Sequence, residues 1–115
     1  MKYLCLVYFE LAALSALSPD EKVKLDRDSL AYDEELNRTG NYIVANALDR
    51  TTTARTVRVR RGKVSSTDGP FAETKEVLGG FILIEAANMD QAVDLAAGIP
   101  LAQLGSIEVR PILKF

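Results

Sequence analysis

Apolar residues dominate the start of the chain, from Tyr3 to Phe9. Aromatic, leucine and valine side chains fill both alternating faces of this stretch, which is typical of a strand covered on both sides. We therefore predict a buried strand over residues 2–9. Residues 11–17 are mostly small and predict a connection or a short helical turn.

A helix start follows at Ser18, Pro19 and Glu21. Ser18 can accept a hydrogen bond from the backbone amide three residues later, Glu21 can reach back, and Pro19 suits the first helical position. The predicted helix runs over residues 18–39 and stops at Gly40. Its most regular stripe has the spacing i, i+4, i+7, i+11 and consists of Leu25, Ser29, Tyr32 and Leu36.

The middle of the chain returns to strand-like patterns. We predict strands over residues 42–48, 54–61 and 64–67, with a hairpin turn at Gly62-Lys63. In the second of these strands the side chains alternate clearly. Val57 and Val59 face one way, whereas Thr56, Arg58 and Arg60 face the other.

The last third predicts a strand over residues 77–86, a helix that begins at Asn88 and ends near Gly98, and a final strand over 106–115. The resulting order contains two βαβ units. The simplest topology for it is a ferredoxin-like α+β sandwich, in which both helices lie on one face of an antiparallel sheet. A chain of 115 residues fits one domain, residues 1–115.

The second face of such a sheet would be bare in a monomer. Leu4, Leu6, Tyr8 and half of the segment 81–84 point toward it. An apolar surface of this size favours association, because covering it removes apolar area from water. We predict a homodimer packed sheet to sheet, which makes a dimeric α+β barrel.

Composition excludes several function classes. The chain has no histidine, which excludes Ser-His and Cys-His dyads and the usual zinc and haem sites. The net charge of −2 argues against a nucleic-acid partner, and the cluster Arg58, Arg60 and Arg61 is interpreted as a solvated strand face. The single cysteine, Cys5, fits a reducing compartment and a place in the core. No apolar run approaches the roughly 20 residues of a membrane span. We predict a cytoplasmic protein without a cofactor, a metal or a membrane partner.

The most distinctive segment is DGPFAETKE at residues 68–76, followed by LGGF at 78–81. It resembles the defining motif of the DGPF family, within the YCII-related superfamily. The likeness covers nearly the whole chain and continues, in order, through residues 1–4, 18–21, 56–64 and 105–111.

The resemblance implies a dimeric α+β barrel of ferredoxin-like protomers with a largely unassigned biochemical role. It also implies a regulatory context, because family members are often encoded beside, or fused to, sigma factors of the extracytoplasmic-function type. More distant YCII-related proteins carry a His/Asp pair regarded as catalytic, and similar barrels include muconolactone-isomerase-like enzymes. The absence of histidine here leaves that pair without a counterpart and argues against such acid–base chemistry.

The segment 68–76 has two interpretations. Asp68 can hydrogen-bond to the backbone amides just ahead and fix a turn, which directs Phe71 inward or across a cleft. In the functional interpretation the loop lines a small-molecule pocket, Lys75 binds an anion, and Asp68 or Glu76 accepts a proton. In the structural interpretation the loop locks the dimer. We favour the structural one for any single residue, because turns of this composition are common.

Three residues elsewhere are candidate ligand contacts. Tyr8 and Tyr32 combine an apolar ring with a polar tip, as a pocket wall requires, and core packing is the alternative. Arg110 either faces a cleft and holds a carboxylate, or pairs with Glu108 or another neighbour. The run 33–35 is acidic, but adjacent helical positions diverge, so it predicts no metal cage.

We consider two functions of different classes. The first is a small-ligand-binding or regulatory module. The second is a cofactor-free enzyme, isomerase-like or lyase-like, that acts on a small metabolite in a pocket between helix 18–39 and the sheet. Engagement of both Asp68 and Glu76 by backbone or salt-bridge partners favours binding, whereas a carboxylate in a closed apolar pocket favours catalysis. Partnership with a sigma factor is a third hypothesis and rests on the resemblance alone.

Overall fold

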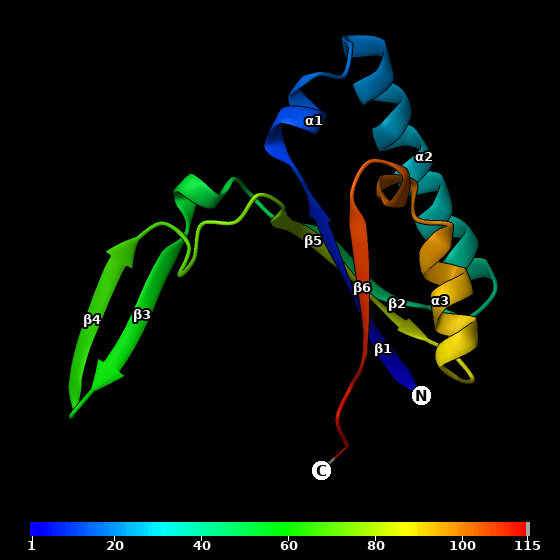
Figure 1. The fold of residues 1–115 in the computed structure, drawn as a ribbon. Coiled ribbons are helices and arrows are strands. Elements are labelled where there is room, and N and C mark those ends of the chain that lie inside the picture. The colour runs from blue at the N-terminus through cyan, green and yellow to red at the C-terminus, as the bar shows by residue number, and fades with distance from the viewer. Residues whose placement is uncertain (115) are drawn as a thin grey trace.

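The computed structural model describes residues 1–114. Its elements follow the predicted order, with short additional helical segments between them (Figure 1). In chain order they are β1 (Lys2–Phe9), α1 (Leu11–Ser15), α2 (Pro19–Arg38), β2 (Tyr42–Ala47), η1 (Thr51–Thr53), β3 (Arg55–Arg60), β4 (Lys63–Asp68), β5 (Val77–Glu85), α3 (Met89–Ala97), η2 (Pro100–Gln103) and β6 (Ser106–Pro111).

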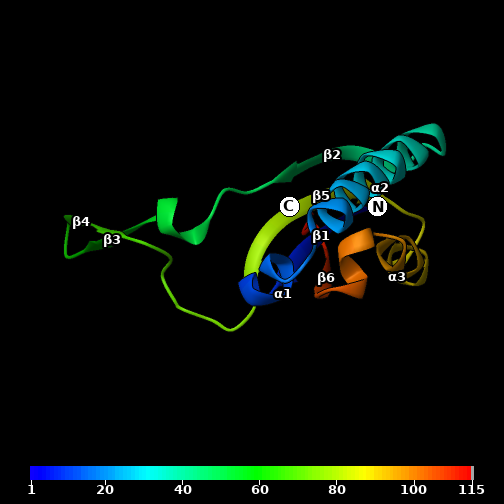
Figure 2. The same ribbon diagram turned by 90° about the horizontal axis from the view of Figure 1, so that it is seen from above.

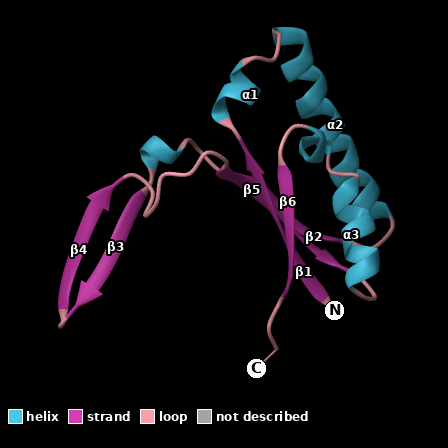
Figure 3. Ribbon diagram, in the orientation of Figure 1, coloured by secondary structure: helices cyan, strands magenta, loops and turns pink. Residues whose placement is uncertain are grey.

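The main sheet has four strands in the order β2-β5-β1-β6, and all neighbouring pairs are antiparallel. This is the ferredoxin-like order, because β1 lies between β5 and β6, and β2, the strand after α2, is at the edge beside β5. Helices α2 and α3 lie on one side of the sheet (Figure 3). The predicted α+β class and antiparallel sheet are therefore confirmed.

The core lies between the sheet and the two helices. Along β1 every second residue is buried, beginning at Tyr3, and β5 contributes Ile82 and Ile84. The helices contribute Leu36, Ala92 and Ala96 to the same cluster. The two-residue period of the strands thus separates the core face from the opposite face.

Cys5 lies in this core with no exposed surface, and burial raises the pKa of its thiol to about 11. The thiolate is the reactive form, so the native protein is expected to resist Ellman's reagent at pH 8. We expect the reaction to be about 100-fold slower than in urea, because access requires opening of the core. Complete labelling within minutes without denaturant would contradict this placement.

The predicted helix caps are confirmed. Glu21 N donates to the Ser18 hydroxyl at 3.1 Å and Ser18 N donates to the Glu21 carboxylate at 2.9 Å, which completes a capping box. Asn88 caps α3 by accepting from Gln91 N at 2.9 Å. Gly40 follows α2 at a φ of 81°, the left-handed conformation that ends helices.

Strands β3 and β4 form a separate hairpin, which we call the arm (residues 55–68). Figures 1 and 2 show it extending away from the four-stranded sheet. Its turn lies at Arg61-Gly62, one residue earlier than predicted, and both residues have positive φ, 52° and 75°. The two-residue hairpin loop requires this backbone at both positions, so Lys63 belongs to β4. The final strand is also shorter than predicted and ends at Pro111; Phe115 lies outside the described residues.

The sheet face opposite the helices, which we call the open face, is covered by no other element within residues 1–114. In register across β5 and β1, Phe81 lies opposite Leu6, and Leu83 lies opposite Leu4. Val44 of β2 lies opposite Leu83 and is 38% exposed. The predicted second apolar surface is therefore present on the protomer.

Candidate functional site

A cavity of about 650 Å³ lies between α2 and the sheet, and we call it the α2 cavity. Its lining comes from α1, α2, β1, β2, β5 and the segment around η2. Most of the lining is apolar and includes Val7, Phe9, Leu25, Ala45, Ile82 and Leu101. A volume of this size is typical of sites for small organic ligands.

Gly79 leaves room for the Phe9 ring in the wall of the α2 cavity. A Cβ atom built at Gly79 would lie 2.0 Å from Cε1 of the Phe9 ring, so the ring packs directly on the glycine backbone. Phe9 and Gly79 both line the α2 cavity. A side chain at position 79 would therefore displace part of the cavity wall.

The polar groups of the cavity are concentrated on α2. Asp26, Ser29 and Asp33 have the spacing i, i+3, i+7, which places them on one side of the helix, and all three line the cavity. No lysine or arginine is among the described residues that line it. The cavity is thus an apolar site whose only lining charges are carboxylates.

Burial raises the pKa of the Asp33 carboxyl above its usual value. The charged form is disfavoured because part of its hydration is lost against the apolar wall. Asp33 is only half-buried, so the carboxylate remains reachable from the cavity mouth. This side chain can therefore accept a hydrogen bond from a ligand or attract a positive charge.

Asp33→Asn is expected to raise the midpoint temperature of unfolding at pH 7 and to leave it unchanged below about pH 3. The folded state binds the proton of Asp33 more tightly than the unfolded state does. Asp33 therefore costs stability as pH rises above its unfolded pKa, the full cost is reached above its raised folded pKa, and the amide removes that cost. The exposed neighbour Glu34→Gln is the control for the loss of one negative charge. An equal gain at pH 3 and pH 7 would contradict the assignment.

Tyr32 forms part of the cavity wall and its hydroxyl donates to the Leu95 carbonyl at 2.6 Å. Burial raises the pKa of this hydroxyl, with smaller contributions from Glu35 and Cys5. A Cβ atom at Gly98 would lie 2.4 Å from the hydroxyl oxygen, so the contact depends on the glycine. Tyr32 therefore links α2 to α3 while one side of it lines the cavity.

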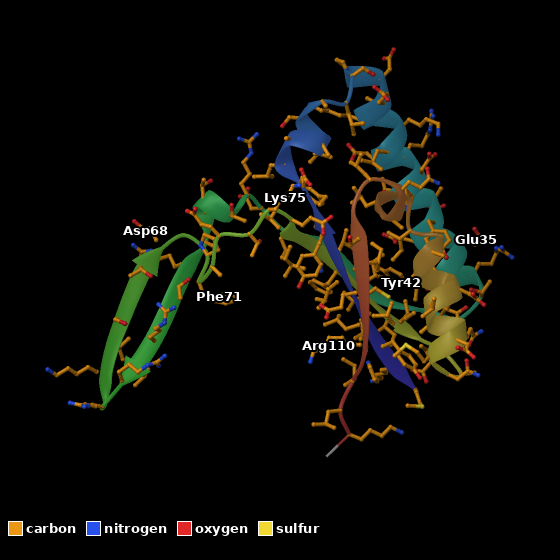
Figure 4. All side chains as sticks on the ribbon, in the orientation of Figure 1. Glu35, Tyr42, Asp68, Phe71, Lys75 and Arg110 are labelled. Atoms are coloured by element: carbon orange, nitrogen blue, oxygen red, sulfur yellow. The ribbon has the colours of Figure 1, made fainter. Side chains whose placement is uncertain are left out.

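The residues of segment 68–76 lie away from the cavity, along the connection between the arm and β5 (Figure 4). Asp68 accepts from Arg55 Nε at 3.2 Å, rather than from the backbone amides just ahead as expected. Glu76 accepts from the Ser106 hydroxyl at 3.1 Å, and Lys75 Nζ lies 3.5 Å from the Glu10 carboxylate. Phe71 does not point inward, because its side chain is 80% exposed.

Tyr8 and Arg110 belong to the open face. Tyr8 lies opposite Leu78 on β5, and Arg110 lies opposite Leu4 on β1. In Figure 4 the Arg110 side chain points to the side of the sheet opposite the helices. Of the seven residues predicted for the site, only Tyr32 lines the α2 cavity.

The sequence reasoning missed Asp26 and Asp33 as site residues. In the sequence, Asp33 stands in the acidic run 33–35, whose members diverge on a helix and so predict no shared site. The available signal was its spacing with Asp26 and Ser29 along the same side as the predicted apolar stripe. That signal identifies the helix side, but it does not show that a cavity lies beneath it.

A second hollow of about 370 Å³ lies between α3 and β6. Its lining is entirely apolar, so it offers no side-chain group to orient a ligand. Among the described residues there is no cluster of three or more potential metal ligands. Within the same range, no helix combines the length and apolarity that a membrane crossing requires.

An antiparallel sheet covered by helices on one face places the protein in the α+β class. The chain belongs to the family described as the YCII-related domain, which it matches over residues 1–115. An uncharacterised protein of Rhizobium meliloti (strain 1021) is 40% identical over 117 residues, covering 100% of this chain and 94% of the relative.

A solved structure has the same fold at lower identity. It is 5-chloro-2-hydroxyhydroquinone dehydrochlorinase (TftG) from Burkholderia phenoliruptrix AC1100, in complex with 2,5-dihydroxybenzoquinone. The TM-score is 0.57 at 17% identity, and the match covers 98% of this chain and 94% of that one. This similarity shows the shared α+β architecture.

Proposed function

We propose that this protein is a small-ligand-binding module that acts as a homodimer. The α2 cavity carries the proposal, because it combines a volume of about 650 Å³, an apolar lining and a few polar groups on one wall. Asp68 and Glu76 are both engaged by other side chains, by Arg55 and Ser106 respectively. Because both carboxylates already have side-chain partners, ligand binding is favoured over catalysis by segment 68–76.

The cavity lining favours a neutral or cationic ring compound as the ligand. Leucine, phenylalanine and isoleucine side chains suit an apolar ring, whereas Asp26 and Asp33 repel a ligand carboxylate or sulfonate. The dehydrochlorinase with the similar fold was solved with 2,5-dihydroxybenzoquinone, a single-ring molecule. A compound of one or two rings is therefore the class to test first.

The open face supports the homodimer. Its central apolar side chains, Leu4, Leu6, Phe81 and Leu83, are adjacent across β1 and β5. A second copy packed on this face would cover all of them at once through a two-fold interface, in which both protomers use the same surface. This arrangement leaves the α2 cavity accessible, because the cavity lies on the helix side of the sheet.

The test uses two dyes with the same ring skeleton. N-Phenyl-1-naphthylamine is neutral, and 8-anilinonaphthalene-1-sulfonate carries a sulfonate. We expect the neutral dye to bind with a rise in fluorescence and at least about tenfold lower Kd than the anionic dye, because no cation lines the cavity. Tighter binding of the anionic dye would contradict the proposed ligand class.

Cavity-filling variants locate the binding. Ala45→Trp on β2 and Ser29→Trp on α2 enter the cavity from opposite walls, and each is expected to weaken binding of the neutral dye about tenfold or more. Ala31→Trp, at an exposed position of α2 outside the lining, is the matched control. Equal binding by all three folded variants would show that the dye, and hence the proposed site, lies elsewhere.

A cofactor-free enzyme is the second candidate, and Asp33 is the observation that favours it. This carboxyl lines an apolar cavity and burial raises its pKa, two properties of a proton-transfer group. Chloride release from 5-chloro-2-hydroxyhydroquinone is the first activity to assay. Turnover that is lost in Asp33→Asn while dye binding is retained would establish catalysis over simple binding.

A further inference from the structure

Nearly all side chains of the arm are exposed to solvent in the protomer. Eleven of its twelve strand residues are exposed, and only Thr56 is half-buried. An isolated two-stranded hairpin is marginally stable in water, since neither face is covered. Something outside the protomer is therefore needed to hold the arm in this form.

The two faces of the arm differ in chemistry. The strand register places Val59 opposite Val64 and Val57 opposite Ser66, so three valines share one face. Val57 is 62% exposed, Val59 is 56% exposed and Val64 is 72% exposed. The other face carries Arg58, Arg60 and Lys63. An apolar face opposite a basic face is typical of a hairpin that packs on a protein surface with one side.

The arm stands on the same side of the sheet as the open face. Figures 1 and 2 both show it projecting away from the side that carries α2 and α3, so the arm and the open face lie on the same side of the sheet. A body packed on the open face would therefore lie on the same side of the sheet as the arm. One occupant would then meet both the open face and the arm.

The exposed area agrees with an occupant of the size of this chain. The protomer exposes 8276 Å², whereas a compact monomer of 12.6 kDa exposes about 6,200 Å². The excess of about 2,000 Å² is in the range that permanent dimers bury on each partner. The radius of gyration, 16.1 Å, likewise exceeds the roughly 13 Å of a compact domain of this length.

Charge favours a second copy of this chain as that occupant. The arm carries five basic residues and one acidic residue, Asp68, for a net charge of +4. Since the whole chain has a net charge of −2, the remainder carries −6. An arm with this charge is attracted to the body of an identical protomer, which speeds encounter and fixes orientation.

We propose that the arm is a clasp that packs its valine face on the body of the partner protomer, with the two arms exchanged in the dimer. The inference rests on the proposed homodimer and adds to it, because the sheet-to-sheet contact alone would leave the arm uncovered. Its surface is Val57, Val59 and Val64, and its partner is a second copy of this chain.

Matched double variants test the clasp by sedimentation equilibrium. Val57→Asp with Val64→Asp charges the apolar face, and we expect the dimer Kd to rise about tenfold or more. Ser65→Asp with Thr67→Asp introduces the same charge on the opposite face, and we expect less than about a threefold rise. Replacing residues 56–67 with Asn-Gly should weaken the dimer at least as much as the valine variant. Circular dichroism checks that the body of each variant is folded.

Each other outcome overturns a distinct claim. A wild-type monomer at micromolar concentration would remove the homodimer and the clasp together. A stable wild-type dimer that both valine-face and deletion variants leave unchanged would remove the clasp alone. A random-sequence DNA duplex retarded by the wild type and released in Arg58→Ala with Arg60→Ala, with dimerisation unaffected by the valine variants, would assign the arm to nucleic acid instead.

Discussion

Leu6→Asp is expected to convert the proposed homodimer into a monomer, with a rise in dimer Kd of about 100-fold or more. Leu6 lies at the centre of the open face, between Phe81 on β5 and Glu108 on β6. An aspartate there would bury a charge beside another carboxylate. In a two-fold interface the change occurs twice, once from each protomer.

Sedimentation equilibrium from high nanomolar to high micromolar concentration measures this change. Val23→Asp is the matched control, because Val23 lies on α2 and is 63% exposed. The control should leave the Kd within about twofold of the wild type, as expected for a substitution outside an interface. A Leu6→Asp dimer as tight as the wild type would exclude the open face as the interface.

Ile84→Ala is expected to lower the free energy of unfolding by about 2–5 kcal/mol. Ile84 is 1% exposed and is paired in register with Tyr3 on one side and Tyr42 on the other. The truncated side chain would leave a void that strands on both sides hold open. Urea unfolding at one fixed protein concentration measures the loss, with an unchanged m-value as the check on the folded state.

Leu30→Ala is the control for removing a side chain of the same size. Leu30 is 67% exposed, so its truncation should cost less than about 1 kcal/mol. Comparable losses in the two variants would show that Ile84 is not a core position of the folded protein. The same comparison tests the assignment of the helix face as the core.

The two faces of β1 were predictable because the evidence for them is local. Continuous apolar residues over 3–9 predict a strand that is apolar on both faces. The structure buries one of these faces, which consists of Tyr3, Cys5, Val7 and Phe9, against the helices. The ends of α2 were predictable for the same reason. Ser18 and Glu21 are three residues apart and find each other without any tertiary contact.

The candidate site was predictable only in part. A pocket between helix 18–39 and the sheet was expected, and the α2 cavity lies there with Tyr32 in its wall. Segment 68–76 has the most distinctive composition of the chain, but it does not line the cavity. Its residues instead pair with Arg55, Glu10 and Ser106, which are distant in sequence, and no local pattern identifies such partners. The homodimer and the sigma-factor partnership stay predictions.

Local sequence patterns account for the order of elements, the helix caps and the division of each strand into two faces. These properties depend on residues within a few positions of one another, where backbone geometry fixes the neighbours. The folded arrangement is needed to see that Asp26 and Asp33 line a cavity, that the arm extends away from the body, and that Asp68 pairs with Arg55. Each of these depends on how separate elements pack or project, and packing is decided by the whole chain at once.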